Sequence, residues 1–197
     1  MTAPHPPFVT QAARMLSVLG HPGLLMPAAV AVAASRADAP PQLLPVALAT
    51  AVVVAVIVGI YSLWQVRAGR WVHIDASNPN ERHQLNLFLA ALLGGAAVLL
   101  WALGQPPPVA LGSLLIGLAV GLTHLLRRWL KISLHAACAL FSVALVWPHP
   151  WLTPAVALLA VGVAWSRLKL RRHTPAEVLL GLGFGAAAGA ALRVFIA

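Results

Sequence analysis

The sequence predicts an all-α protein, a polytopic bundle of six to seven transmembrane helices. Of its 197 residues, 60% are hydrophobic and only 9% are charged, and the mean hydropathy is +0.87. A soluble domain of this length could not hide that much apolar surface from water. Several apolar runs also approach the roughly 20 residues needed to cross about 30 Å of hydrocarbon. A transmembrane β-barrel is excluded because runs such as 49–58 do not alternate between polar and apolar residues.

The net charge and the cysteine content narrow further the class of protein to which the chain can belong. The net charge of +9 would suggest nucleic acid as the partner of a soluble protein, but here it indicates the basic collar of a membrane protein. Cys138 is the single cysteine and lies in an apolar run, so neither an intrachain disulfide nor a sulfur metal cluster is expected. The N-terminus, with prolines at 4, 6 and 7 and a lone Arg14, lacks the layout of a cleaved signal peptide. We therefore expect one integral membrane domain over 1–197, without nucleic acid and without a cofactor.

The apolar runs define the order of the crossings. Residues 1–20 are irregular and then weakly amphipathic, and could lie along the interface. Residues 21–35 are apolar but short, and together with the preceding segment could make one kinked crossing. The remaining crossings are expected at 42–64, 84–104, 109–126, 132–147, 151–165 and 175–197.

The last crossing carries three glycines at four-residue spacing, Gly181, Gly185 and Gly189. Such spacing places small residues on one helix face and permits close helix contact. We expect this face to pack within the monomer rather than to form a dimer, and the sequence leaves the oligomeric state open.

Three polar connections separate the crossings, at 65–83, 127–135 and 166–177. Two helical hairpins lie between them, so all three connections meet on one side of the membrane. A single polar site assembled from these connections is therefore topologically permitted.

The most polar of the three connections ends in a helix start. Thr174 is the expected N-cap, Pro175 takes the first helical position, and Glu177 completes a capping box. A helix N-terminus favours anions, and Arg167 and His173 lie next to it, so this stretch predicts a phosphate pocket. The alternative is a basic membrane-side loop followed by an ordinary capped helix.

This stretch reads Ser-Arg, five residues, His, three residues and an acid. The pattern resembles the third signature of the type-2 phosphatidic acid phosphatase superfamily, which is shared by vanadium haloperoxidases. The acid is usually Asp in that family, whereas here it is Glu177. The family's second signature, Pro-Ser-Gly-His, is similar to residues 132–135, where the Ser and the His are kept and the other two residues are replaced.

Within the second signature, Ser133 and His135 are the retained residues, and Leu134 stands where the family has Gly. Glycine lets a backbone N–H approach phosphate closely, and Leu134 can still donate its N–H. The alternatives are that Ser133 is only an N-cap and that His135 is a buried polar side chain satisfied by a neighbouring helix. A histidine in the first turn of a membrane helix is costly without a role or a partner, which favours function.

The first signature, Lys, six residues and Arg-Pro, is matched only weakly at 75–83. Arg82 is kept, His83 replaces the Pro, and Asp75 replaces the Lys. Asp75 cannot bind phosphate as Lys does, so Asp75 and His83 are candidates for orienting groups; the alternative is a solvated loop of mixed charge. Three other cations could supply the missing charge: Lys131, Arg70 and Lys169.

The resemblance implies a membrane-embedded lipid phosphatase that acts on a phosphomonoester or diphosphate of a phospholipid or polyprenyl lipid. His173 would attack phosphorus to give a phosphohistidine, Glu177 would fix its tautomer, and His135 would protonate the leaving oxygen and later activate water. Phosphate would be held by cations and N–H donors; the expected groups are Arg167, Arg82, Lys131, Ser133 and Leu134. Two alternatives stay open: a degenerate member that binds or moves a phospholipid, and a lipid-to-lipid phosphotransferase.

No metal is expected in this mechanism, because the acids Asp75, Glu81 and Glu177 are few and no pair has ligand spacing. Charge asymmetry predicts which side of the membrane the site faces. Only Arg36 and Arg193 of the 13 Lys and Arg residues fall on the side opposite the motifs. The positive-inside rule then places the site at the cytoplasmic face of a bacterial inner membrane.

Overall fold

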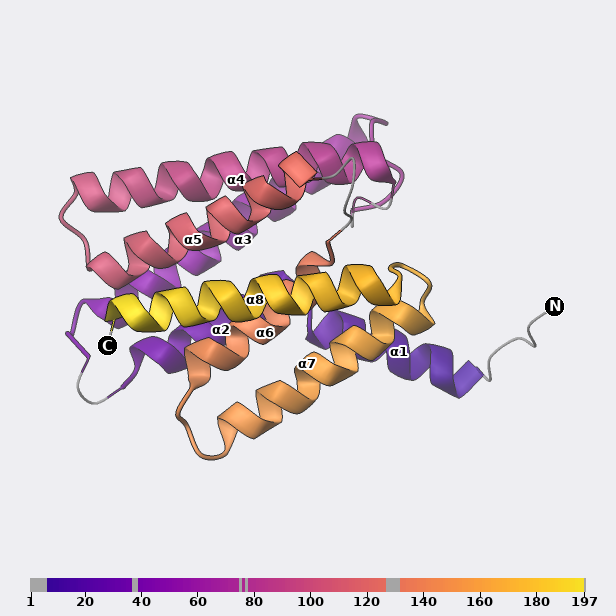
Figure 1. The fold of residues 1–197 in the computed structure, drawn as a ribbon. Helices are drawn as coiled ribbons and strands as arrows, with labels where there is room; N and C mark the ends of the chain where they lie inside the picture. The colour runs from indigo at the N-terminus through magenta and orange to yellow at the C-terminus, as the bar shows by residue number, and fades with distance from the viewer. Residues whose placement is uncertain (1–6, 37–38, 75, 77, 127–131, 197) are drawn as a thin grey trace. The chain divides into compact units, whose positions relative to one another are not determined.

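The computed structural model describes residues 7–36, 39–74, 76, 78–126 and 132–196. Eight helices and no strand occur in these ranges, which confirms the all-α prediction. The chain divides into two compact units, each described by itself (Figure 1). Unit 1 comprises residues 1–33 and 131–194, and unit 2 comprises residues 34–130 and 195–197.

Unit 1 contains the first two helices of the chain and the last three. Its helices are α1 (Pro7–Leu19), α2 (Pro22–Ala34), α6 (Leu134–Val146), α7 (Leu152–Lys169) and, except for its last residues, α8 (Pro175–Ile196). Unit 2 contains α3 (Leu43–Arg67), α4 (Pro79–Ala102) and α5 (Pro107–Leu125).

Five helices are long and apolar enough to cross a membrane, namely α3, α4, α5, α7 and α8, and α1 with α2 makes a sixth if the bent pair is one span. The axes of α1 and α2 differ by 51°, in line with the predicted kinked crossing. The helix at the predicted crossing 132–147 is shorter than expected. With 13 residues, α6 extends only about 20 Å at 1.5 Å per residue, less than the hydrocarbon thickness.

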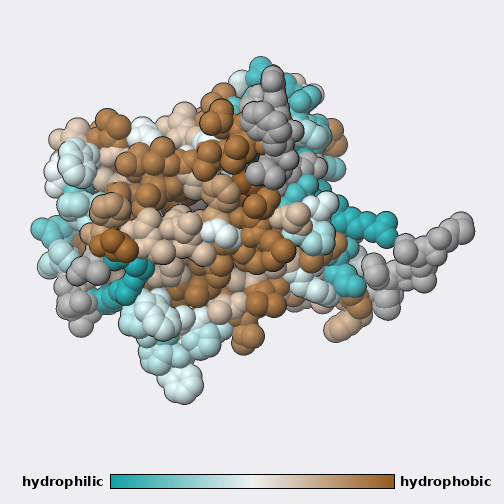
Figure 2. All heavy atoms as spheres, in the orientation of Figure 1, coloured by the Kyte–Doolittle hydropathy of each residue, from teal (hydrophilic) through white to brown (hydrophobic). Residues whose placement is uncertain are grey.

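Most of the apolar surface of these helices faces outward. The buried share of the most apolar window is 6% in α3 and at most 28% in α5 and α8. Figure 2 shows apolar side chains along the helices and polar side chains gathered toward their ends. Hydrocarbon is the solvent that such a surface fits, because intrahelical hydrogen bonds already satisfy the backbone.

Two helices reach further into the polar connections than expected. The first is α4, which begins at Pro79 because Asn78 and Glu81 form a capping box: Glu81 N–H donates to Asn78 Oδ1 at 2.9 Å, and Asn78 N–H donates to the Glu81 carboxylate at 3.3 Å. The second is α7, which continues to Lys169, so Arg167 lies in a helix and not in a loop. Basic residues in a last turn interact favourably with the helix dipole.

The glycine face of α8 packs against α6. A Cβ at Gly181 would collide with the carbonyl oxygen of Ser133, and one at Gly185 with the carbonyl oxygen of Ala137. These contacts confirm the predicted packing within the monomer. They also bring the first turns of α6 and α8, which carry the second and third signatures, side by side (Figure 1).

Candidate active site

The third signature forms the predicted capping box at the start of α8. Glu177 N–H donates to Thr174 Oγ1, and Thr174 N–H donates to Glu177 Oε2, both at 3.3 Å. The same Oε2 lies 2.8 Å from Nδ1 of His173, whose side chain is only 8% exposed. The expected contact between Glu177 and His173 is therefore present. With Nδ1–H donating to the carboxylate, Nε2 carries the lone pair.

The second signature is joined to the third through the backbone. Ser133 N–H donates to the carbonyl oxygen of Glu177 at 3.1 Å. Ser133 is also the N-cap of α6, because its Oγ accepts from Ala136 N–H at 3.5 Å, and its side chain is fully buried. Ser133 thus fills the N-cap role that the sequence left open as an alternative. We assign it to the scaffold of the site, with Leu134 following it as the first residue of α6.

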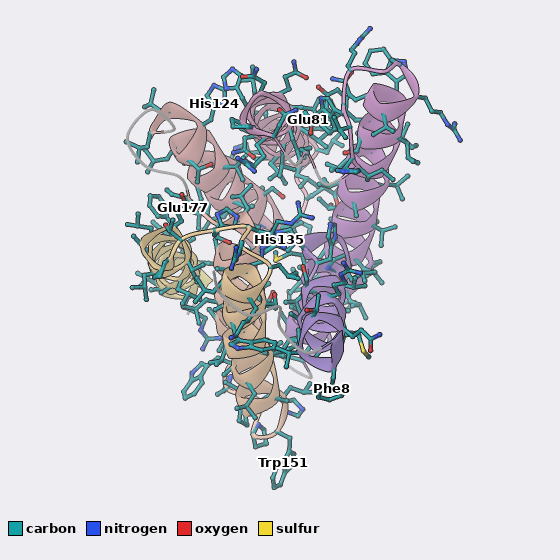
Figure 3. All side chains as sticks on the ribbon, turned by 90° about the vertical axis from the view of Figure 1, so that its right-hand side faces the viewer. Phe8, Glu81, His124, His135, Trp151 and Glu177 are labelled. Atoms are coloured by element: carbon teal, nitrogen blue, oxygen red, sulfur yellow. The ribbon has the colours of Figure 1, made fainter. Side chains whose placement is uncertain are left out.

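His135 lies in the first turn of the short helix α6 (Figure 3). Its ring meets the ring of His21 edge-to-face, with centroids 5.3 Å apart. Backbone hydrogen bonds hold together the segments that carry His135, His173 and Arg167: His173 N–H donates to Arg167 C=O at 3.3 Å, and Ser133 N–H, two residues before His135, donates to Glu177 C=O at 3.1 Å.

Arg167 is anchored by a side chain of α1. It lies in the last turn of α7, and its Nη1 donates to Ser17 Oγ of α1 at 2.8 Å. This hydrogen bond joins residues 150 positions apart and fixes one end of the guanidinium group. A planar guanidinium is well suited to bind an oxyanion.

The sequence-predicted residues fall into three groups. Unit 1 brings together His173, Glu177, Arg167, His135, Ser133 and Leu134. Asp75 and Lys131 lie outside the described residues. Arg82 and His83 belong to the first turns of α4 in unit 2.

His83 stacks on a second imidazole. Its ring lies parallel to that of His124 in α5, with centroids 4.1 Å apart and planes at 20°. Figure 3 labels His124 and Glu81 in this unit. The buried Glu81 accepts from Val72 N–H at 2.8 Å as well as from Asn78, so this carboxylate holds the connection between α3 and α4 in place.

Arg70, a candidate for the missing cation, has partners within unit 2. Its Nη1 donates to Gln65 Oε1 at 3.1 Å, and its guanidinium lies 4.4 Å from the ring centroid of Trp64. Lys169, the other described candidate, is exposed at the end of α7.

Sequence reasoning missed two residues of the cluster, Ser17 and His21. The His21 ring meets His135 edge-to-face, with centroids 5.3 Å apart and planes at 82°. A histidine before Pro-Gly has the local pattern of a turn, and a serine in a weakly amphipathic helix has no pattern of its own. Only the packing of α1 on α7 reveals them.

The described part of the chain holds no group of three or more His, Cys, Asp or Glu side chains that could bind a metal ion. The site is built of imidazoles, a guanidinium and helix N-termini, which are groups suited to an oxyanion, and its carboxylate, Glu177, is paired with His173. Similarity to known proteins adds nothing to this geometry. No family model matches the chain, and no curated protein or solved structure matches it at a significant level.

Proposed function

We propose that the protein is a membrane-embedded lipid phosphatase that hydrolyses a phosphomonoester or diphosphate of a phospholipid or polyprenyl lipid. One observation carries the proposal. The Nδ1 of His173 is paired with Glu177 at 2.8 Å, and backbone hydrogen bonds join this pair to Arg167 and to Ser133, two residues before His135. This arrangement is what a nucleophilic imidazole requires: an orienting carboxylate, an oxyanion-binding cation and a second imidazole for proton transfer.

In the first step, Nε2 of His173 attacks phosphorus. The N–P bond forms as the bond from phosphorus to the leaving oxygen breaks, and Glu177 stabilises the positive charge that develops on the ring. The leaving oxygen takes a proton from His135. An anionic phosphoryl group bound in the site would favour the protonated form of His135.

In the second step, water hydrolyses the phosphohistidine. His135, neutral after the first step, accepts a proton from the attacking water. The new O–P bond forms as the N–P bond breaks, which releases phosphate and returns His173 to its neutral form. Catalysis in both steps depends on positioning and charge stabilisation, as is general for phosphoryl transfer.

The proposal predicts phosphate release without added metal. The full chain purified in detergent should release inorganic phosphate from phosphatidic acid or from a polyprenyl diphosphate in the presence of EDTA. The trapped phosphoprotein should lose its phosphate in acid and keep it in base, since phosphohistidine is labile to acid and stable to base. The absence of phosphate release from every lipid phosphate offered, together with retained lipid binding, would favour a non-enzymatic lipid carrier.

A second acceptor for the phosphoryl group distinguishes hydrolysis from phosphotransfer to a lipid. The same assay is run with a lipid alcohol present as a competing nucleophile. We expect inorganic phosphate to remain the main product, because the proposed second step uses water. A phosphorylated acceptor lipid in place of inorganic phosphate would identify a phosphotransferase.

We further propose that the site opens at the cytoplasmic face, on the basis of the positive-inside rule. In a Cys138→Ala background, cysteines introduced at the exposed positions Asn80 and Ala176 should react with an impermeant thiol reagent only after the cells are permeabilised. Trp151, which is 80% exposed at the opposite end of α7, provides the matched position that should react in intact cells. The reverse pattern of labelling would place the site on the outer face.

A further inference from the structure

The break between α1 and α2 carries a third imidazole of the cluster. Leu19 ends α1 and Pro22 begins α2, and His21 lies between them at a bend of 51°. His21 N–H donates to Val18 C=O at 3.0 Å, and His21 C=O accepts from Leu24 N–H at 2.9 Å. The residue thus closes one helix and opens the next, which fixes its backbone.

The position of this break is set by its packing on α7. A Cβ at Gly20 would collide with the side chain of Val163, and one at Gly162 would lie 3.1 Å from Leu16. Val163 is fully buried and precedes Arg167 by four residues, so the two lie on one face of α7. The chain at Gly20 is therefore held against α7 one helical turn before Arg167.

The tautomer of His21 is set by its own turn. Nδ1 accepts a hydrogen bond from Gly23 N–H at 3.1 Å, so in the neutral ring the proton resides on Nε2. His21 is exposed, whereas His135 and His173 are partly buried. With its ring centroid 5.3 Å from that of His135, it is an accessible N–H donor beside the proposed proton-transfer group.

We propose that His21 is a phosphate-binding residue, which donates its Nε2–H to a nonbridging oxygen of the phosphoryl group held by Arg167. This inference rests on the proposed function and adds a ligand to the same site. A phosphoryl group presents three nonbridging oxygens, and Arg167 is shared with Ser17. A donor from the α1–α2 break would bind an oxygen on the side of the cluster formed by the N-terminal helices.

Two amide substitutions distinguish the roles of the two ring nitrogens of His21. Asn places an acceptor near the position of Nδ1 and can retain the hydrogen bond with Gly23, whereas Gln places a donor near the position of Nε2. We expect His21→Asn to raise KM for the lipid phosphate about 10- to 100-fold, with kcat changed less than about threefold, since a hydrogen bond to a charged group is lost. His21→Gln should restore KM to within about threefold of the wild type.

The matched control is His149→Asn. His149 is also an exposed turn histidine whose Nδ1 accepts from a backbone N–H, that of Leu152 at 3.2 Å, but it precedes α7 at the end remote from Arg167. Its KM should not change. A wild-type KM in His21→Asn, a loss of kcat alone, or a His21→Gln protein as impaired as His21→Asn would each overturn the assignment. If His21→Asn does not fold, His21→Ser, which also offers an acceptor to the first turn of α2, replaces it.

Binding of inorganic phosphate distinguishes this inference from the proposed function. Calorimetry on the full chain in detergent should give a dissociation constant about 10-fold or more weaker for His21→Asn than for the wild type. If the wild type releases no phosphate from lipids, the proposed function fails, and the calorimetry still decides the role of His21. Equal affinities, or no binding by the wild type, would refute that role.

Discussion

Replacement of His173 by alanine is expected to lower phosphate release by roughly four orders of magnitude or more, because it removes the only group proposed to form the covalent intermediate. The side chain of His173 is 8% exposed and contacts Glu177 through Nδ1, so the folded state of the variant is measured beside its activity. The measurement is kcat of the purified full chain, with the amount of trapped phosphohistidine as a second readout. Retention of full activity would refute the mechanism.

Glu177→Gln and His149→Ala provide the two controls for this experiment. The glutamine can keep the hydrogen bond with Thr174 N–H but loses the carboxylate that orients the imidazole, so we expect a smaller loss of kcat, roughly 10²- to 10⁴-fold. His149 lies in the exposed turn before α7, outside the proposed site, and its replacement should leave kcat unchanged.

Replacement of Gly185 by alanine is expected to lower the free energy of unfolding by about 1–3 kcal/mol, the usual cost of overpacking a closed interface. The added Cβ would meet the backbone carbonyl of Ala137, which cannot turn aside as a flexible side chain can. Helices α6 and α8 would have to separate. The measurement is the denaturation midpoint of the purified protein in detergent.

Gly183→Ala is the matched variant on the same helix. Gly183 is exposed, and a Cβ there would meet nothing within 4 Å. Its stability should change by less than about 0.5 kcal/mol. Equal destabilisation by the two substitutions would show that the cost arises from loss of glycine in the helix and not from its contact with α6.

Local patterns predicted much of unit 1. The capping box at Thr174 and Glu177, the contact of Glu177 with His173, and the packing of the glycine face within the monomer follow from spacings of three and four residues along one helix. Such spacings are fixed by helix geometry, so the sequence alone can reveal them.

Contacts between distant segments could not be predicted in the same way. Ser17 and Arg167 are 150 residues apart, and nothing in either neighbourhood indicates the other. His21 likewise meets His135 only because Gly20 packs on α7. The helix ends at Pro79 and Lys169 were also misplaced, because polar first and last turns had been assigned to the connections.

The hydrogen bond from Ser133 N–H to Glu177 C=O has a consequence for how this site can vary. Neither atom belongs to a side chain, so the tether between the two imidazole-bearing turns does not depend on which residues flank them. Ile132 and Leu134 can therefore occupy places held by Pro and Gly in the family it resembles, while the spacing of the paired turns is preserved. The sequence of such a site can therefore change considerably while its geometry is preserved.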